Sequence, residues 1–295
     1  MVDQDSVEKS DRSPVTVADF GSQALICRHL TEVFDDPIVG EEDSGDLRKE
    51  ENTALLESVQ GYLREAGIDG SAEEVCDWID RGNGDVAERY WTLDPIDGTK
   101  GFLRNDQYAV ALALIEGGDV KVGVLACPAL PVEDADGGTL MVAVRGEGTV
   151  MMRLEEEDGV QVSVDISGSE RSHRFVESVE SGHGNQTLQG QVATAVNIHS
   201  PSLRMDSQAK YAAVARGDAV LYLRLPSKDP GRYAEKMWDH AAGALVVEEA
   251  GGKVTDMHGK PLDFGSSERM NANQGVVVSN GAIHDDVIAA LGRIA

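Results

Sequence analysis

The chain has 295 residues, of which 41% are hydrophobic and 26% are charged, as is ordinary for a globular protein with a sizeable core. Its formal net charge of −26 at pH 7 argues against nucleic-acid polymers and anionic membranes as partners, because both would repel it. No stretch of eighteen apolar residues predicts a transmembrane helix, and the polar N-terminal residues MVDQDSVEKSDRS do not resemble a signal peptide. We therefore expect a cytoplasmic protein.

The first half of the chain predicts helices followed by strands in succession. Helices are predicted over 17–34, 50–66 and 72–81, and a short strand ends at Val39. The runs that predict further strands are RYWTL, YAVALALI, VKVGVLAC and TLMVAV. Strands that follow one another in hairpins favour a mostly antiparallel sheet flanked by helices.

The second half alternates between strands and helices, which predicts an α/β layer. The predicted strands contain HRFVESV, AVLYLRL and GVVVS, and the predicted helices cover 186–197, 206–217, 239–250 and IHDDVIAALGRI. The polar stretch SGSERS predicts a boundary between an N-terminal α+β domain (1–168) and a C-terminal α/β domain (169–295). The acidic run 155–158 is expected at a solvated hairpin tip.

Three cysteines, Cys27, Cys76 and Cys127, are widely spaced along the chain. An odd number at this spacing fits neither a disulfide framework nor a zinc site. We expect reduced structural thiols.

The segment Trp91-Thr-Leu-Asp94-Pro-Ile-Asp97-Gly98-Thr99 carries the densest chemical signal. An apolar strand runs into two carboxylates three residues apart, in a turn shaped by proline and glycine. Both carboxylates are expected to face one cavity, where magnesium prefers such oxygen ligands. The segment after Asp97 is expected to open a helix whose N–H groups face a phosphate. The alternative is that Asp-Gly is only a turn signal.

Two further acidic features are ambiguous when each is taken alone. Glu41 follows a short apolar strand, and a solvated acidic loop is the simpler interpretation. Asp239 precedes a run of small residues and has the appearance of a helix N-cap.

Taken together, G-E-E at 40–42, D-P-I-D-G-T at 94–99 and W-D-x-A-A-G at 238–243 resemble the lithium-sensitive, magnesium-dependent phosphatase superfamily, which includes inositol monophosphatase and fructose-1,6-bisphosphatase. Four other segments are similar to its 3'(2'),5'-bisphosphate nucleotidase branch, and the likeness extends over nearly the whole chain from Ser13 onward. These segments are SPVTVADF at 13–20, DGTKGFLR at 97–104, DSQAKY at 206–211 and YLRLP at 222–226. The resemblance implies a layered α-β-α-β-α sandwich.

The resemblance also implies the roles of individual residues. Two or three Mg²⁺ ions would be held, with Asp94 shared between two of them, and Asp19 and Thr99 would orient and deprotonate the attacking water. The residues implied in metal binding are Glu41, Asp94, Ile96 through its carbonyl, Asp97 and Asp239. The residues implied in substrate binding are Gly98, Thr99, His183, Ser207, Lys210 and Arg224.

The implied activity is removal of the 3'-phosphate from adenosine 3',5'-bisphosphate, giving AMP and phosphate, with 3'-phosphoadenylyl sulfate as a further substrate. An inositol phosphate phosphatase is the alternative enzyme, because the metal machinery is shared. A non-catalytic nucleotide-binding protein would require a broken metal set, yet all four carboxylates and Thr99 are present. The partner is thus expected to be a small nucleotide, while the oligomeric state is left open.

The excess of 52 acidic over 26 basic residues exceeds what a metal site needs. Most of it is expected on the surface, where self-repulsion would be relieved by salt. We hypothesise a salt-rich cytoplasm, and the alternative is an ordinary acidic protein.

Overall fold

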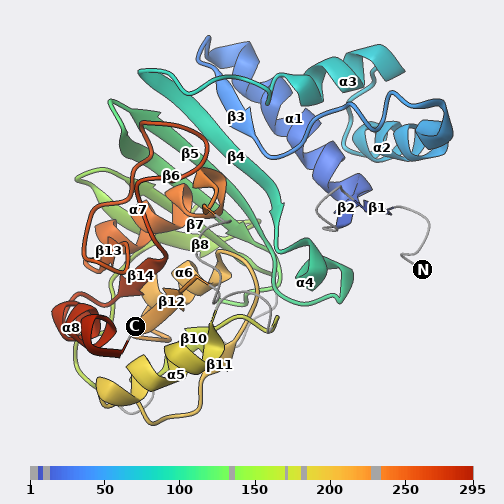
Figure 1. Ribbon diagram of the computed structural model, residues 1–295. Coiled ribbons are helices and arrows are strands. Elements are labelled where there is room, and N and C mark those ends of the chain that lie inside the picture. The colour runs from blue at the N-terminus through green and yellow to red at the C-terminus, as the bar shows by residue number, and fades with distance from the viewer. Residues whose placement is uncertain are drawn as a thin grey trace.

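The computed structural model describes residues 6–8, 14–132, 137–169, 172–180, 185–226 and 234–294. These residues form two large β-sheets separated and flanked by helices (Figure 1). A short antiparallel pair, β1 (Ser6–Glu8) and β2 (Pro14–Thr16), precedes them.

The larger sheet has seven strands in chain order, from β3 to β9. Neighbouring strands are antiparallel except for β3 and β4, which are parallel. This confirms the mostly antiparallel arrangement that the strand runs predicted. The strands are β3 (Ile38–Gly40), β4 (Arg89–Asp97), β5 (Ala109–Glu116), β6 (Asp119–Cys127), β7 (Thr139–Val144), β8 (Gly148–Arg153) and β9 (Val160–Val162). The acidic run 155–158 lies exposed between β8 and β9, as predicted.

The smaller sheet has five strands in the order β11-β10-β12-β14-β13. Strand β10 runs parallel to β11 and β12, whereas β14 is antiparallel to both β12 and β13. Its strands are β10 (Phe175–Glu177), β11 (Leu203–Arg204), β12 (Leu221–Arg224), β13 (Lys253–Thr255) and β14 (Val276–Ser279). The change from one sheet to the other falls between β9 and β10, so the boundary at 168/169 stays a prediction that agrees with this division.

Helices occupy three layers around the two sheets (Figure 1). The helices α1, α2 and α3 pack together beside β4, α6 and α7 lie between the sheets, and α5 packs with α8 outside the smaller sheet. The layered α-β-α-β-α sandwich is thereby confirmed. The helices are α1 (Val17–Val33), α2 (Thr53–Glu65), α3 (Ala72–Asp80), α4 (Thr99–Leu103), α5 (Gln186–Ala195), α6 (Ala209–Ala215), α7 (Ala241–Glu249) and α8 (His284–Ile294), with 3₁₀ turns η1 (Glu50–Asn52) and η2 (Met237–Asp239).

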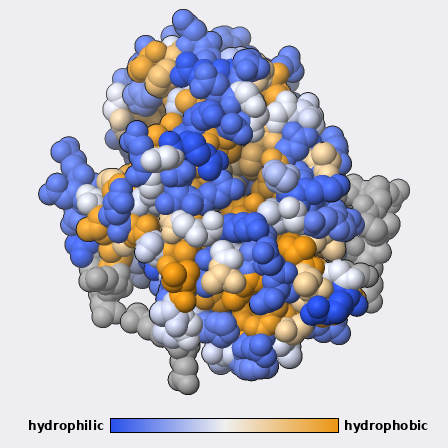
Figure 2. All heavy atoms as spheres, turned by 90° about the vertical axis from the view of Figure 1, so that its left-hand side faces the viewer, coloured by the Kyte–Doolittle hydropathy of each residue, from blue (hydrophilic) through white to orange (hydrophobic). Residues whose placement is uncertain are grey.

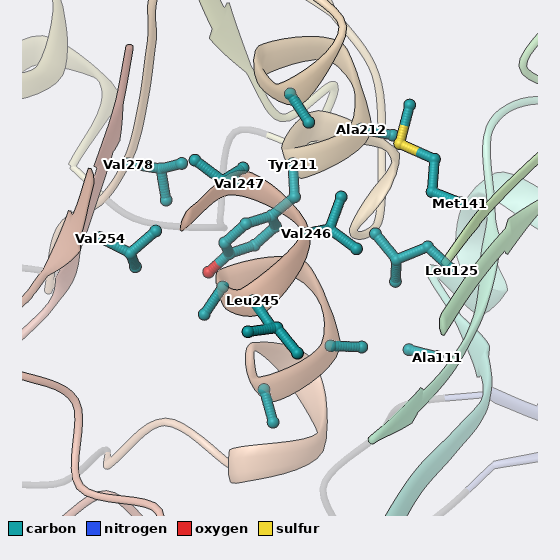
Figure 3. Close-up of a cluster of buried hydrophobic side chains, with 14 of the residues drawn as sticks. Ala111, Leu125, Met141, Tyr211, Ala212, Leu245, Val246, Val247, Val254 and Val278 are labelled. Carbon is teal, nitrogen blue, oxygen red and sulfur yellow. The ribbon is translucent and has the colours of Figure 1, made fainter. Parts of the chain in front are cut away.

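The central helices α6 and α7 are largely apolar because both faces meet a sheet, with Lys210 as the charged residue buried in α6. Every residue of α6, and every residue of α7 from Ala241 to Val247, is buried. Figure 3 shows the side chains of α7 between Leu125 and Met141 of the larger sheet and Val254 and Val278 of the smaller one. This continuous core fixes the position of α7, which begins directly beside the predicted metal ligand Asp239.

The surface has the polar character that the composition predicts. Figure 2 shows hydrophilic residues over much of one face, with apolar residues exposed between them. The acidic pair Glu73-Glu74 is exposed, whereas Asp36 is half-buried and pairs with Arg89 at 3.5 Å. Among the described residues, the three cysteines are free and buried, and no helix has the length and apolarity needed to cross a membrane.

Candidate active site

Three carboxylates from two distant parts of the chain meet at one cavity of about 200 Å³. Asp94 and Asp97 lie at the end of β4, where a register shift inserts an extra residue, as in a β-bulge. Asp239 enters from the turn η2 before α7. Oxygen atoms of the three side chains all lie within 4.8 Å of one another.

The electrostatics of this cluster favour a bound cation. Burial raises the pKa of Asp94 well above its usual value, and repulsion from Glu41 and Asp97 raises it further. Burial also raises the pKa of Asp97 and of Asp239. Within the described residues, Asp94 Oδ1 is buried without a hydrogen-bond partner. An orphaned carboxylate oxygen among three acids fits a divalent metal, which takes oxygen ligands and offsets their repulsion.

Asp239 is not an N-cap, so the capping interpretation was wrong. The N-cap of α7 is His240, which makes no side-chain capping bond. A second acidic group consists of Glu235, Asp239 and His240. Two of its members are already engaged, because Glu235 pairs with Arg224 at 3.2 Å and His240 Nδ1 lies 2.7 Å from the Tyr211 hydroxyl. The cluster around Asp94 is the better metal site.

Glu41 lies on the wall of the same cavity, so it is not simply part of a solvated loop. Its backbone N–H donates to the carbonyl of Leu93 at 3.1 Å, which places it beside the end of β4. The side chain of Gln23, on α1, accepts from the N–H of Glu42 at 3.1 Å and donates to its carbonyl. A Cβ at Gly82 would lie 2.5 Å from Gln23 Nε2, so a larger residue there would displace this amide.

The predicted pair Thr99 and Asp19 is brought together across two elements. The Thr99 hydroxyl, at the first residue of α4, lies 3.3 Å from Asp19 Oδ1 and 3.2 Å from the carbonyl of Ile96. Asp19 is buried in the first turn of α1, where its other oxygen accepts from the Thr16 N–H and hydroxyl at 2.7 and 2.6 Å. This capping box holds Oδ2 of Asp19 against Thr16, and Oδ1 faces Thr99.

The second half of the chain contributes cations to the cavity wall. Lys210 is buried on α6, donates to the Ser207 carbonyl at 2.7 Å and lies over the ring of Tyr222. Burial lowers its pKa to about 8, although the Asp97 carboxylate opposes this. Arg224, at the end of β12, lines the cavity too. The predicted residue His183 lies outside the described residues.

The pairing of Arg224 with Glu235 belongs to a chain of contacts that the sequence analysis did not identify. Burial would raise the pKa of Glu235, but Arg224 and His240 lower it to about 2, so it is ionised. His240 Nε2 lies 3.4 Å from Glu235 and Nδ1 faces Tyr211. Tyr211 and His240 stand inside the recognised DSQAKY and WDHAAG segments, which was the only available signal.

The inositol monophosphatase family model matches residues 2–294, so the chain belongs to that family. A protein of Schizosaccharomyces pombe named 3'(2'),5'-bisphosphate nucleotidase is 45% identical, with 98% of this chain and 86% of the relative covered. A protein of Emericella nidulans with the same name is 42% identical, with 98% and 90% covered. An IMPase of Thermotoga maritima has a similar fold (TM-score 0.64, 22% identity, covering 99% of this chain and 88% of that one). Another similar fold is an IMPase/NADP phosphatase complexed with Mg²⁺ and phosphate (TM-score 0.62, 18% identity, covering 98% and 87%).

Proposed function

We propose that the chain is a magnesium-dependent phosphomonoesterase that removes the 3'-phosphate of adenosine 3',5'-bisphosphate, giving AMP and phosphate. The observation that carries this proposal is one cavity with two kinds of wall. Buried carboxylates around Asp94 form what we call the carboxylate wall, and Lys210 and Arg224, which line the same cavity, form the cationic wall. A substrate with one phosphate to cleave and another to hold matches this division. The names of the relatives described above support the same substrate.

The carboxylate wall would hold two or three Mg²⁺ ions. Glu41, Asp94 and the carbonyl of Ile96 form one donor set. Asp94, Asp97 and Asp239 form the other. When bound, such ions supply charge neutralisation of the cleaved phosphate and stabilisation of the leaving oxygen.

The proposed proton acceptor at the attacking side is Asp19. Its Oδ1 lies 3.3 Å from the Thr99 hydroxyl, and a water held by that hydroxyl would lose its proton through it to the carboxylate. A threonine alone is a poor base, so the buried carboxylate is needed. The αL turn at Gly98, with φ of 85°, sets Thr99 at the start of α4.

The cationic wall would hold the phosphate that is not cleaved. Lys210 and Arg224 supply charge-assisted donors, and Ser207 and Gly98 line the same cavity. We also propose that His183 binds the nucleotide and that 3'-phosphoadenylyl sulfate is a second substrate. A cytoplasmic location, lithium inhibition and adaptation to high salt remain proposals, as does the absence of nucleic-acid and membrane partners.

An inositol phosphate phosphatase would use the same carboxylates, and the cations distinguish the two. Phosphate release should be measured in Mg²⁺ with adenosine 3',5'-bisphosphate, 3'-phosphoadenylyl sulfate, AMP and inositol 1-phosphate. We expect kcat/KM to be highest for the bisphosphate and release to stop when a chelator is added. A preference for inositol 1-phosphate would favour the alternative enzyme, and no release from any compound would favour a binding protein.

A further inference from the structure

Gln208 contacts one proposed metal ligand, Asp97, and the backbone around another, Asp239. These two ligands lie 142 residues apart in the sequence. It is buried directly before α6, and its backbone N–H donates to Asp97 Oδ2. Its side-chain Nε2 donates to the carbonyl of Trp238 at 2.8 Å, and its Oε1 accepts from the N–H of Gly243 at 3.0 Å. One residue is therefore bonded both to a ligand and to the backbone around another.

The two side-chain bonds bracket Asp239 on both sides. Trp238 is the residue before it in η2, and Gly243 is the third residue of α7. The first N–H groups of a helix have no partner within the helix, and α7 lacks a side-chain cap of its own. Gln208, at the N-cap of α6, supplies the missing acceptor and so holds the start of α7, two residues after Asp239.

The backbone before Gln208 is shaped to reach Asp97. Ser207 adopts a left-handed conformation with φ of 63°, which is uncommon for a residue with a side chain. It packs against Gly98, where an added Cβ would lie 2.9 Å from the Ser207 Cβ. The turn that carries Asp97 and the turn that carries Gln208 are thus in direct contact.

We propose that Gln208 is a positioning residue that sets the separation of Asp97 and Asp239 and thereby the affinity for divalent cations. This inference rests on the proposed metal site. Gln208 itself does not touch the substrate phosphate or the ion in this proposal. It acts by fixing two carboxylates that would otherwise move apart under their mutual repulsion.

The test compares Gln208→Met with Gln189→Met. Methionine keeps the length of glutamine but removes both side-chain bonds, and the backbone N–H to Asp97 remains. Gln189 is a buried glutamine on α5, in the outer helical layer, and is not part of the cavity wall. Its substitution controls for the general cost of changing a buried amide.

The first readout is the Mg²⁺ concentration at half of the rise in melting temperature, measured without substrate. Loss of an outer partner of a metal ligand costs about 10- to 100-fold in metal affinity, so Gln208→Met should raise this midpoint by about that factor. Gln189→Met should leave it unchanged. In activity assays, excess Mg²⁺ should restore kcat of Gln208→Met, with KM for the bisphosphate within about twofold of the original chain.

A Gln208→Met midpoint equal to that of the original chain would overturn the inference and leave the proposed function intact. No Mg²⁺-dependent rise in the original chain would instead contradict the proposed metal site. If Gln208→Met does not fold, Gln208→Asn provides the second variant. It keeps an amide but is one methylene too short for both bonds, so it should also raise the midpoint, and an unchanged midpoint would overturn the inference.

Discussion

Replacing Asp94 with asparagine should stabilise the metal-free protein while abolishing its activity. Asp94 has a buried oxygen with no partner among the described residues, and its neighbours Asp97 and Asp239 have oxygens within 4.8 Å. Two unit charges at that distance repel by about 3 kcal/mol at an effective dielectric constant of 20. The carboxylates relieve part of this by taking up a proton, as the raised pKa of Asp94 indicates. We therefore expect Asp94→Asn to gain about 1–3 kcal/mol in unfolding free energy, or a melting temperature higher by roughly 2–10 °C.

The assay is a thermal melt at pH 7 in chelator and again in Mg²⁺, together with phosphate release from the bisphosphate. In chelator the Asn variant should melt above the original chain. Mg²⁺ should raise the melting temperature of the original chain far more than that of the variant. The raised pKa means that ionisation of Asp94 is unfavourable in the folded state. Asp94 therefore lowers the free energy of unfolding only above the ordinary aspartate pKa. The gap in chelator should accordingly close as pH falls towards about 4.

The matched control is Asp256→Asn, at a buried aspartate outside the cavity wall. Asp256 Oδ1 accepts from the N–H groups of His258 and Lys260 at 2.8 and 2.9 Å, so this carboxylate is satisfied. Its replacement should lower the melting temperature, because hydrogen bonds to a charged acceptor are weakened. A lower melting temperature for Asp94→Asn in chelator, or retained phosphate release, would refute the claim that these carboxylates repel one another until cations bind.

Three other predictions concern specificity, pH and salt. In steady-state assays, Lys210→Ala and Arg224→Ala should each raise KM for the bisphosphate roughly tenfold to a hundredfold, with little change in KM for inositol 1-phosphate. An equal rise in KM for both substrates would show that these cations do not recognise the nucleotide. Burial lowers the pKa of His284 to about 4, so between about pH 6.5 and 4 this histidine is protonated in the unfolded chain but neutral in the folded one. The free energy of unfolding, measured in urea, should therefore fall as pH drops from about 6.5 to about 4. His284→Gln should flatten that dependence, and an unchanged slope would assign it to other groups. The melting temperature should rise from low to molar NaCl, because screening weakens the repulsion of a chain with charge −26, and a flat or falling curve would contradict the high-salt hypothesis.

The long, regular elements could be predicted from the sequence because each carries a repeating apolar pattern. The predicted helix 17–34 is α1 (Val17–Val33), and the predicted helix 72–81 is α3 (Ala72–Asp80). The predicted helix 206–217 is shorter, since the left-handed Ser207 delays its start to Ala209. Strands β1, β2, β9, β11 and β13 were missed because segments of two or three residues are too short to show alternation. The six-residue strand β8 was missed as well.

The chemically active residues could be predicted mostly through motifs, and the residues that hold them could not. Asp94 and Asp97 were predicted from their type and spacing, and Asp239 through the family resemblance of its segment; the fold brings all three to one cavity. Gln23 lies in no recognised motif, and Gln208 stands inside the DSQAKY segment, which does not indicate its partners. Each is a single amide in a helical region, and its partners lie 19 to 56 residues away in the sequence. Such contacts exist only once the tertiary structure has formed.

The central claim is that one cavity cleaves the 3'-phosphate and keeps the other phosphate on its cationic wall. Phosphorus NMR of the products formed from adenosine 3',5'-bisphosphate in Mg²⁺ tests it most directly. We predict that adenosine 5'-phosphate and inorganic phosphate accumulate in equal amounts, with no adenosine 3'-phosphate. Accumulation of adenosine 3'-phosphate, or an unchanged bisphosphate spectrum, would contradict the account.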